Sequence, residues 1–279
     1  MSLQRTVTSL VLAPIAAAAV LFLPTPWLAA VIAVICLLGL WEWARLVGLD
    51  DAVQRSIYVA ANLTLMAALP WSDINRSHVL FKLGALIGAV WWVAAAVWLA
   101  RPGFGREARD GTRSLKLAAG TLSMVPAWCG LVLLHFGSPA DPRSGPRWTL
   151  LAILMVWVAD SCAYLFGCRF GRRKLIPQIS PGKTWVGFWG GLICAMAVTL
   201  ACAPLVGVSL ARLPLLALLG LLGVAASVIG DLFESLMKRH AGVKDSGTLV
   251  PGHGGVLDRI DGLMAALPVI AICKEWLGL

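Results

Sequence analysis

Long apolar runs constrain this chain more than any other feature of its sequence. Hydrophobic residues make up 59% of the 279 residues and charged residues only 13%, whereas a soluble domain carries about a quarter charged residues. A water-facing globule cannot hide so much apolar surface, and about 20 apolar residues suffice to cross a bilayer as a helix. The runs lie at 7–24, 27–47, 57–70, 79–100, 115–137, 148–167, 185–208, 212–233 and 262–278. They predict an all-α, polytopic integral membrane protein with about nine transmembrane helices.

The first apolar run and the cysteines indicate neither a cleaved signal peptide nor covalent cross-links. One arginine precedes the first run, as in a signal peptide, but further apolar runs follow directly, so we expect it to be retained as a span. The cysteines are scattered and none forms a CxxC pair, which indicates neither a disulfide framework nor a zinc site. They are Cys36, Cys129, Cys162, Cys168, Cys194, Cys202 and Cys273.

The distribution of basic residues predicts the orientation of the helices. The net charge is +9, and in a membrane protein such an excess marks cytoplasmic loops and anionic headgroups rather than nucleic acid. With nine spans and a cytoplasmic amino terminus, 17 of the 23 lysines and arginines fall on the cytoplasmic side. This split places two polar segments, Cys168–Thr184 and Glu234–Asp261, on the cytoplasmic side, where nucleotides are.

Three aspartates in and before the second polar segment indicate a metal site. Asp231 lies at the end of a long apolar run, where a carboxylate without a partner is costly. On a helix it shares a face with Glu234, Ser235, Lys238 and Arg239. Asp258 and Asp261 would share a face if a helix begins near Val256. Three converging carboxylates repel one another unless a cation lies between them, and such an oxygen-rich cluster suits Mg²⁺.

Cations and glycines accompany these carboxylates along the chain. Pro251-Gly252 and Gly254-Gly255 allow the backbone to turn sharply and approach a ligand closely. Cations, a carboxylate-bound metal and glycine-rich backbone together predict a phosphate site. The alternative is a solvated loop whose charges only cap helices. The cations are Lys238, Arg239, Lys244, His253 and Arg259.

The first polar segment contains the sequence SPGKT at 180–184. A Walker A loop would need a preceding strand and a glycine five places before Gly182, where this chain has Pro177. That interpretation is therefore rejected. Ser180 and Lys183 remain candidates for phosphate contact. Asp160 lies among apolar neighbours and favours a functional role, whereas the basic run at 172–174 is equally well explained as a membrane-surface anchor.

The stretch SLMKRHAGVKDSGTLVPGHGGVLDRID, from Ser235 to Asp261, resembles the signature of phosphatidate cytidylyltransferases (CDP-diacylglycerol synthases). The first segment, with DS, GR, ISPGKT and GG, is similar to the same family, so the resemblance covers at least the carboxy-terminal half. Two positions depart from the family pattern. Val250 stands where a larger apolar residue is usual, and Val186 stands where glutamate is expected.

The resemblance implies an enzyme of phospholipid biosynthesis that transfers CMP from CTP to phosphatidic acid and releases pyrophosphate. It implies Mg²⁺ as cofactor and leaves a second cation open. We expect a bacterial inner-membrane protein with its active site at the cytoplasmic edge of the carboxy-terminal helices, the bilayer and the two substrates as partners, and no nucleic acid; a homodimer is left open. Residues 1–140 would form a membrane scaffold and residues 141–279 the catalytic region.

Roles follow from the same resemblance and from the charges. The catalytic residues would be Asp231, Asp258, Asp261 and Lys244, the three aspartates binding the metal and Asp160 serving as an extra ligand or as the orienter of a basic residue. CTP and phosphate would be bound by Lys183, Ser180, Lys238, Arg239, His253 and Arg259. Glu42, between Trp41 and Trp43, is interpreted as a structural acid at the interface.

Two rival functions remain on the sequence alone. A CTP-dependent polyprenol or other lipid kinase would use the same metal and phosphate chemistry and would differ in its products. A secondary transporter would also have many spans and intramembrane acids, but it more often has repeated halves with broken helices near the midplane. Because the polar groups cluster in one carboxy-terminal region, the sequence favours the enzyme.

Overall fold

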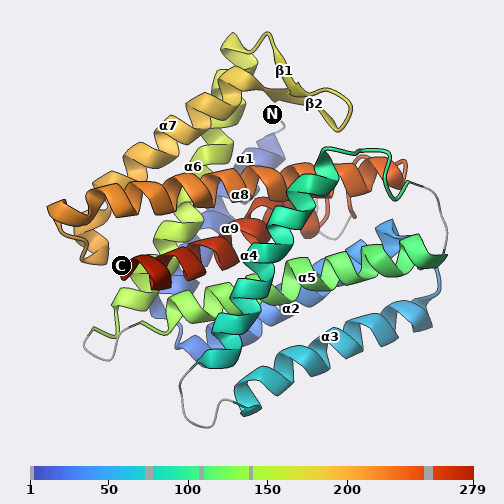
Figure 1. Ribbon diagram of the computed structural model, residues 1–279, viewed down its shortest axis with the longest axis horizontal. Helices are drawn as coiled ribbons and strands as arrows, with labels where there is room; N and C mark the ends of the chain where they lie inside the picture. Colours follow the sequence, from blue (N-terminus) through green and yellow to red (C-terminus); the bar gives the residue numbers. More distant parts are fainter. Residues whose placement is uncertain (1–2, 73–77, 107–109, 138–140, 248–253) are drawn as a thin grey trace.

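The computed structural model describes residues 3–72, 78–106, 110–137, 141–247 and 254–279. These residues form nine α-helices, two short 3-10 helices and one two-stranded sheet (Figure 1). The helices are α1 Leu3–Phe22, α2 Thr25–Leu46, α3 Ala52–Ser72, α4 Val79–Leu99, α5 Asp110–His135, α6 Ser144–Phe170, α7 Trp185–Ala201, α8 Leu213–His240 and α9 Leu257–Leu277. Each overlaps one of the nine apolar runs, so the predicted helical class is confirmed.

Five helical segments in the described part of the chain are long and apolar enough to cross a membrane. They are Thr25–Leu46, Val79–Leu99, Gly111–His135, Ser144–Phe170 and Leu210–His240. α7 and the last half of α1 are apolar but shorter. Prolines lie inside α1, α3, α5 and α9, which membrane bundles tolerate because neighbouring groups satisfy the freed backbone. The chain is therefore a helical membrane protein.

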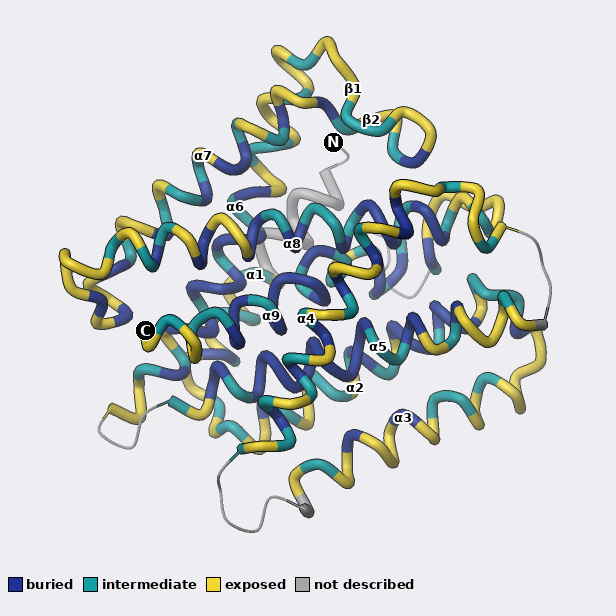
Figure 2. The backbone as a smooth tube through the Cα atoms, in the orientation of Figure 1, coloured by how far each residue is buried: buried dark blue, intermediate teal, exposed yellow. Residues whose placement is uncertain are grey.

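The outer surface of the bundle is apolar, as lipid contact requires. Large hydrophobic side chains recur every three or four residues along one exposed face of α4, at Val79, Leu83, Ile87, Val90, Val93 and Val97. In water such a continuous apolar stripe would be a liability. α3 lies at the edge of the bundle, and most of its described side chains are exposed (Figure 2).

The centre of the bundle is formed where α5 and α9 cross. A Cβ added at Gly130 of α5 would meet the backbone of Leu267 and Pro268 at 2.8 Å, so glycine allows the two helices to touch. Two fully buried tryptophans hold neighbouring helices to this centre. Trp43 of α2 donates its indole N–H to the carbonyl of Lys116 (2.8 Å), and Trp92 of α4 donates to that of Met264 (3.1 Å). Both indole donors are thus satisfied inside the bundle.

The polar segments meet at one end of the bundle, which we call the site end. Here Glu42, near the end of α2, accepts a hydrogen bond from the first turn of α9. At the end of α8, Arg239 donates to the hairpin between α6 and α7, and His240 contacts the carbonyl of Pro102 between α4 and α5. The site end therefore contains the ends of α2, α4, α6 and α8 and the starts of α5, α7 and α9.

The start of α2, the end of α5, the start of α8 and the end of α9 lie at the opposite end. His135, at the end of α5, contacts the hydroxyl of Thr25 at the start of α2 (2.9 Å). Arg212, just before α8, donates to the carbonyl of Gly278 just after α9 (2.5 Å). Consecutive helices therefore run antiparallel, with connections alternating between the two ends, as Figure 1 shows for α4 to α9.

The first polar segment, expected as a loop, folds into a short antiparallel hairpin at the site end. Strand β1 spans Lys174–Ile176 and strand β2 spans Ser180–Thr184, with Lys174 opposite Thr184. Thr184 then caps α7, because its hydroxyl accepts the backbone N–H of Gly187 (3.1 Å). This hairpin is the one sheet within the described residues, and it fixes Lys183 two residues before the start of α7.

Candidate active site

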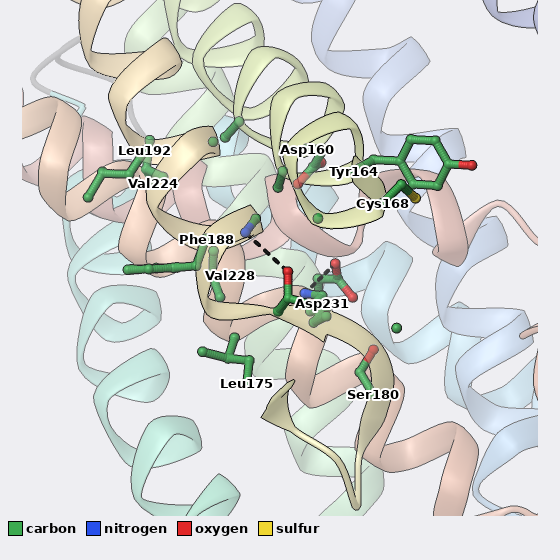
Figure 3. A pocket seen from close by; sticks show the side chains of 18 of the residues that line it. Asp160, Tyr164, Cys168, Leu175, Ser180, Phe188, Leu192, Val224, Val228 and Asp231 are labelled. Carbon is green, nitrogen blue, oxygen red and sulfur yellow. Dashed lines mark hydrogen bonds and ion pairs between the residues drawn. The ribbon is translucent and has the colours of Figure 1, made fainter. Parts of the chain in front are cut away.

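A cavity of about 460 Å³ opens at the site end between α6, the hairpin, α7, α8 and the start of α9. One part is lined by polar side chains and the other by apolar ones, including Leu192, Val224 and Val228 (Figure 3). A chamber of this kind can hold a ligand with a charged head and an apolar body. Its polar lining consists of Asp160, Ser180, Lys183, Thr184, Asp231, Asp258 and Asp261.

Three carboxylates converge beside the polar part of the cavity, which Asp231 and Asp261 line and behind which Glu234 is buried. Asp231 and Glu234 lie three residues apart on α8, and Asp261 projects from the first turns of α9. One oxygen from each lies within 4.8 Å of the others. The approach of the two helices explains this convergence, because a Cβ at Gly230 would overlap the carbonyl oxygen of Asp261. We call Asp231, Glu234 and Asp261 the carboxylate triad.

Glu234 is the most deeply buried carboxylate of the triad. Its side chain is fully buried, and Oε2 lies 2.6 Å from the ammonium of Lys238. Among the described residues, Oε1 has no hydrogen-bond partner. A buried, unsatisfied carboxylate oxygen is unfavourable. Three carboxylate oxygens around one point are the ligand type that Mg²⁺ takes, so the donor set fits a divalent cation.

Asp258 lies beside the triad in a different set of contacts. Its Oδ1 is 2.7 Å from the ammonium of Lys238. Its Oδ2 accepts hydrogen bonds from the backbone N–H groups of Ser246 (3.1 Å) and Gly255 (2.8 Å) and lies 3.0 Å from the Ser246 hydroxyl. Asp258 therefore orders the loop before α9 and holds Lys238 against Glu234. The structure groups Glu234, rather than Asp258, with the other two predicted metal ligands.

Two lysines balance part of this negative charge. Lys183 extends from the hairpin so that its ammonium lies 2.5 Å from Oδ2 of Asp231, and both side chains are about three-quarters buried. Lys238 lies between Glu234 and Asp258. Both ammonium groups are thus beside the triad, where a substrate phosphate would approach a bound metal.

The other predicted site residues have different positions. Ser180 and Asp160 line the cavity. Arg239 is exposed, and its Nε donates to the carbonyl of Ile179 (3.2 Å), which ties the hairpin to α8. Lys244 and Arg259 are exposed at the site end. His253 and Val250 lie outside the described residues.

Two residues emerge from the structure as parts of the site that the sequence analysis did not assign to it. Glu234 shares a helical face with Asp231, and this spacing was the available signal for its place in the triad. Ser246 is buried and bridges the loop to Asp258. No local pattern marked it, because its partners lie on other elements.

Comparison with known proteins shows the family to which the chain belongs. The Cytidylyltransferase family matches the chain over residues 3–277. A phosphatidate cytidylyltransferase of Pseudomonas aeruginosa is 44% identical over 270 residues, covering 96% of this chain and 95% of the relative. That of Haemophilus influenzae is 36% identical over 278 residues, covering 95% and 96%. One from Staphylococcus aureus is 48% identical over 150 residues, or 53% of this chain and 56% of the relative. The chain is therefore a member of the cytidylyltransferase family.

Proposed function

We propose that this enzyme is a phosphatidate cytidylyltransferase, which joins the CMP unit of CTP to phosphatidic acid. The single observation that carries the proposal is the carboxylate triad with its two lysines, Lys183 and Lys238, next to the polar side of a cavity whose other side is apolar. The relatives that span nearly the whole chain bear the same name. A nucleotide triphosphate and an anionic lipid are the two ligands that such a cavity suits.

The chemistry requires positioning and positive charge more than a strong base. A phosphate oxygen of the lipid, already anionic, attacks the α-phosphorus of CTP, and the bond from that phosphorus to the oxygen bridging to the β-phosphate breaks. Pyrophosphate leaves with the bonding electron pair. The barrier arises from bringing two anions together and from the charge on the leaving group.

The described residues can meet these requirements. Asp231, Glu234 and Asp261 would hold Mg²⁺, which neutralises phosphate charge when bound. Lys183 and Lys238 would contact phosphate oxygens as charge-assisted donors. Asp258 keeps Lys238 oriented, and Ser180 lies within reach on the hairpin side of the cavity. Further contributions to metal and phosphate binding remain predictions for a second cation and for four residues: Lys244, His253, Arg259 and Asp160.

The fold supports a membrane arrangement for this reaction. We propose that all nine helices cross the bilayer, with the amino terminus and the site end in the cytoplasm of a bacterium and the bilayer its inner membrane. The hairpin and the loop before α9 share one end of the bundle, and the basic residues are concentrated there. CTP would enter from water while the acyl chains of the lipid remain at the apolar side of the cavity. A homodimer remains compatible with this arrangement.

The test is a product analysis. Membranes that contain the protein are incubated with labelled CTP and phosphatidic acid, with and without EDTA. We expect CDP-diacylglycerol and pyrophosphate in equal amounts, and loss of both with EDTA. Release of CDP together with a phosphorylated lipid would instead identify a lipid kinase, and absence of any CTP-dependent product from the folded protein would refute the proposal. The Asp261→Asn variant serves as the inactive control.

A further inference from the structure

Glu42 of α2 lies under the start of α9, more than 200 residues away in the chain. Its side chain is 3% exposed. Its Oε1 accepts the backbone N–H of Val256 (3.1 Å), and its Oε2 accepts that of Leu257 (2.9 Å). Helix α9 has no side-chain cap from its own N-cap residue, Val256. Glu42 therefore supplies from another helix the carboxylate that satisfies the first amides and complements the helix dipole.

The described residues on both sides of the gap at 248–253 pack closely around this carboxylate. A Cβ added at Gly247 would overlap Oε1 of Glu42, and one added at Gly255 would overlap Oε2 of Glu42 and the hydroxyl of Ser246. Both glycines are thus required by the close approach of backbone to the buried acid. Gly255 is one of the glycines that suggested a phosphate loop, and its close contact is with side chains of the protein itself.

Ser246 connects Glu42 to the site. Its hydroxyl lies 3.0 Å from Oε2 of Glu42 and 3.0 Å from Oδ2 of Asp258, so one hydroxyl bridges two carboxylates. Asp258 in turn holds Lys238, whose ammonium lies against Glu234 of the triad. A continuous polar path therefore runs from α2 to the proposed metal ligands. The path joins Glu42, in the predicted scaffold region 1–140, to residues of the predicted catalytic region 141–279.

We infer that Glu42 is a positioning residue for the reaction. By fixing the first turn of α9, it keeps Asp258 in contact with Lys238 and keeps Asp261 in place within the triad. The inference rests on the proposed function for the reaction that this geometry serves. Without the carboxylate, the amides of Val256 and Leu257 lose their acceptors, and the first turn of α9 can shift relative to α8. A displacement of about 1 Å at reacting groups can lower the rate about 100-fold.

The experiment separates positioning from a purely structural cap. The Glu42→Gln variant keeps the size of the side chain but loses its charge and one acceptor oxygen. We expect kcat of the folded, detergent-solubilised full chain to fall about tenfold to 100-fold while KM for CTP changes little, because the reacting geometry is lost. The control is Asp141→Asn, since Asp141 accepts the N–H of Arg143 at the start of α6, at the opposite end. This control should retain wild-type kcat.

Ser246→Ala provides an independent variant if Glu42→Gln folds poorly. The double variant should be no slower than the slower single variant, because both act through one path. Wild-type kcat in folded Glu42→Gln protein, or multiplicative losses in the double variant, would overturn the inference.

A second readout does not depend on turnover of phosphatidic acid. Amide hydrogen exchange in the segment 254–258 should be faster in Glu42→Gln than in wild type. The Mg²⁺ midpoint, which is the concentration that gives half of the maximal rise in melting temperature, should be higher. If wild type makes no CDP-diacylglycerol, the proposed function fails, and these two measurements still decide the inference. Unchanged exchange and an unchanged Mg²⁺ midpoint would refute the positioning role.

Discussion

The ammonium of Lys183 lies 2.5 Å from Oδ2 of Asp231, so the hairpin is tied directly to the carboxylate triad. This ion pair joins the first polar segment to the helix that leads into the second. It also gives Asp231 a cation in the absence of metal. Metal binding to Asp231 would compete with Lys183 and free the ammonium for a phosphate oxygen.

This exchange predicts opposite effects of one substitution on metal binding and on turnover. In Lys183→Gln, Asp231 loses its competing cation, so Mg²⁺ should bind more tightly in the absence of nucleotide. Turnover should fall by about 100-fold, because a charge-assisted phosphate contact in a partly desolvated site is lost. Thermal stabilisation by Mg²⁺ and steady-state kinetics measure the two effects. Weaker Mg²⁺ binding together with normal turnover would contradict the exchange.

The triad predicts that Glu234 and Asp258 respond differently to loss of charge. Glu234→Gln should lower CDP-diacylglycerol formation by orders of magnitude, and added Mg²⁺ should partly restore it by mass action. Asp258→Asn should also slow the reaction, because Lys238 loses a partner, but its Mg²⁺ dependence should shift less. The measurement is a Mg²⁺ titration of each variant. A near-normal rate and unshifted midpoint for Glu234→Gln would remove it from the metal site.

The orientation of the protein can be checked by cysteine labelling at two exposed positions. Ser246 would be a poor choice because it is buried. Ala241 is exposed at the site end and Arg143 at the opposite end. In a background in which exposed Cys168 is replaced by serine, an impermeant maleimide should label Arg143→Cys in intact cells and Ala241→Cys only after permeabilisation. The reverse pattern would invert the topology.

Much of the fold could be predicted because apolar runs specify helices almost by themselves. Five helices in the described part of the chain are long and apolar enough to cross the apolar core of a bilayer. The β-hairpin was not predicted, since a short strand pair with Pro181 and several charges has no clear alternation of apolar residues. Its position depends on the long-range hydrogen bond from Arg239.

The site could be predicted only in part, for geometric reasons. Asp231 and Asp261 do converge, as the sequence suggested, but the third member of the triad depends on how α8 crosses α9. The sequence predicted Asp258 as that third member, and Glu234 was noted only for sharing a helical face with Asp231. Glu42 was interpreted as an acid at the membrane interface, whereas the structure buries it under α9. No spacing rule relates residues on such distant segments.

The helix crossing itself gives the last prediction. Gly230 lies in α8 where a Cβ would overlap the carbonyl oxygen of Asp261 and approach the side chain of Ala265. Gly230→Ala should therefore push α9 away from α8 and separate the triad oxygens. We expect at least a 100-fold loss of activity and a higher Mg²⁺ requirement, because catalytic geometry is sensitive to displacements of about 1 Å.

A matched glycine shows whether such a loss comes from the crossing. Gly111, in the first turn of α5, has open space where a Cβ would be added, and Gly→Ala at an unstrained helical position stabilises by up to about 1 kcal/mol. Gly111→Ala should thus keep full activity with equal or higher thermal stability. The two variants are compared for membrane insertion, CDP-diacylglycerol formation and Mg²⁺ midpoint. If Gly230→Ala inserts normally and retains both wild-type activity and the wild-type midpoint, the close contact of α8 with α9 does not set the geometry of the triad.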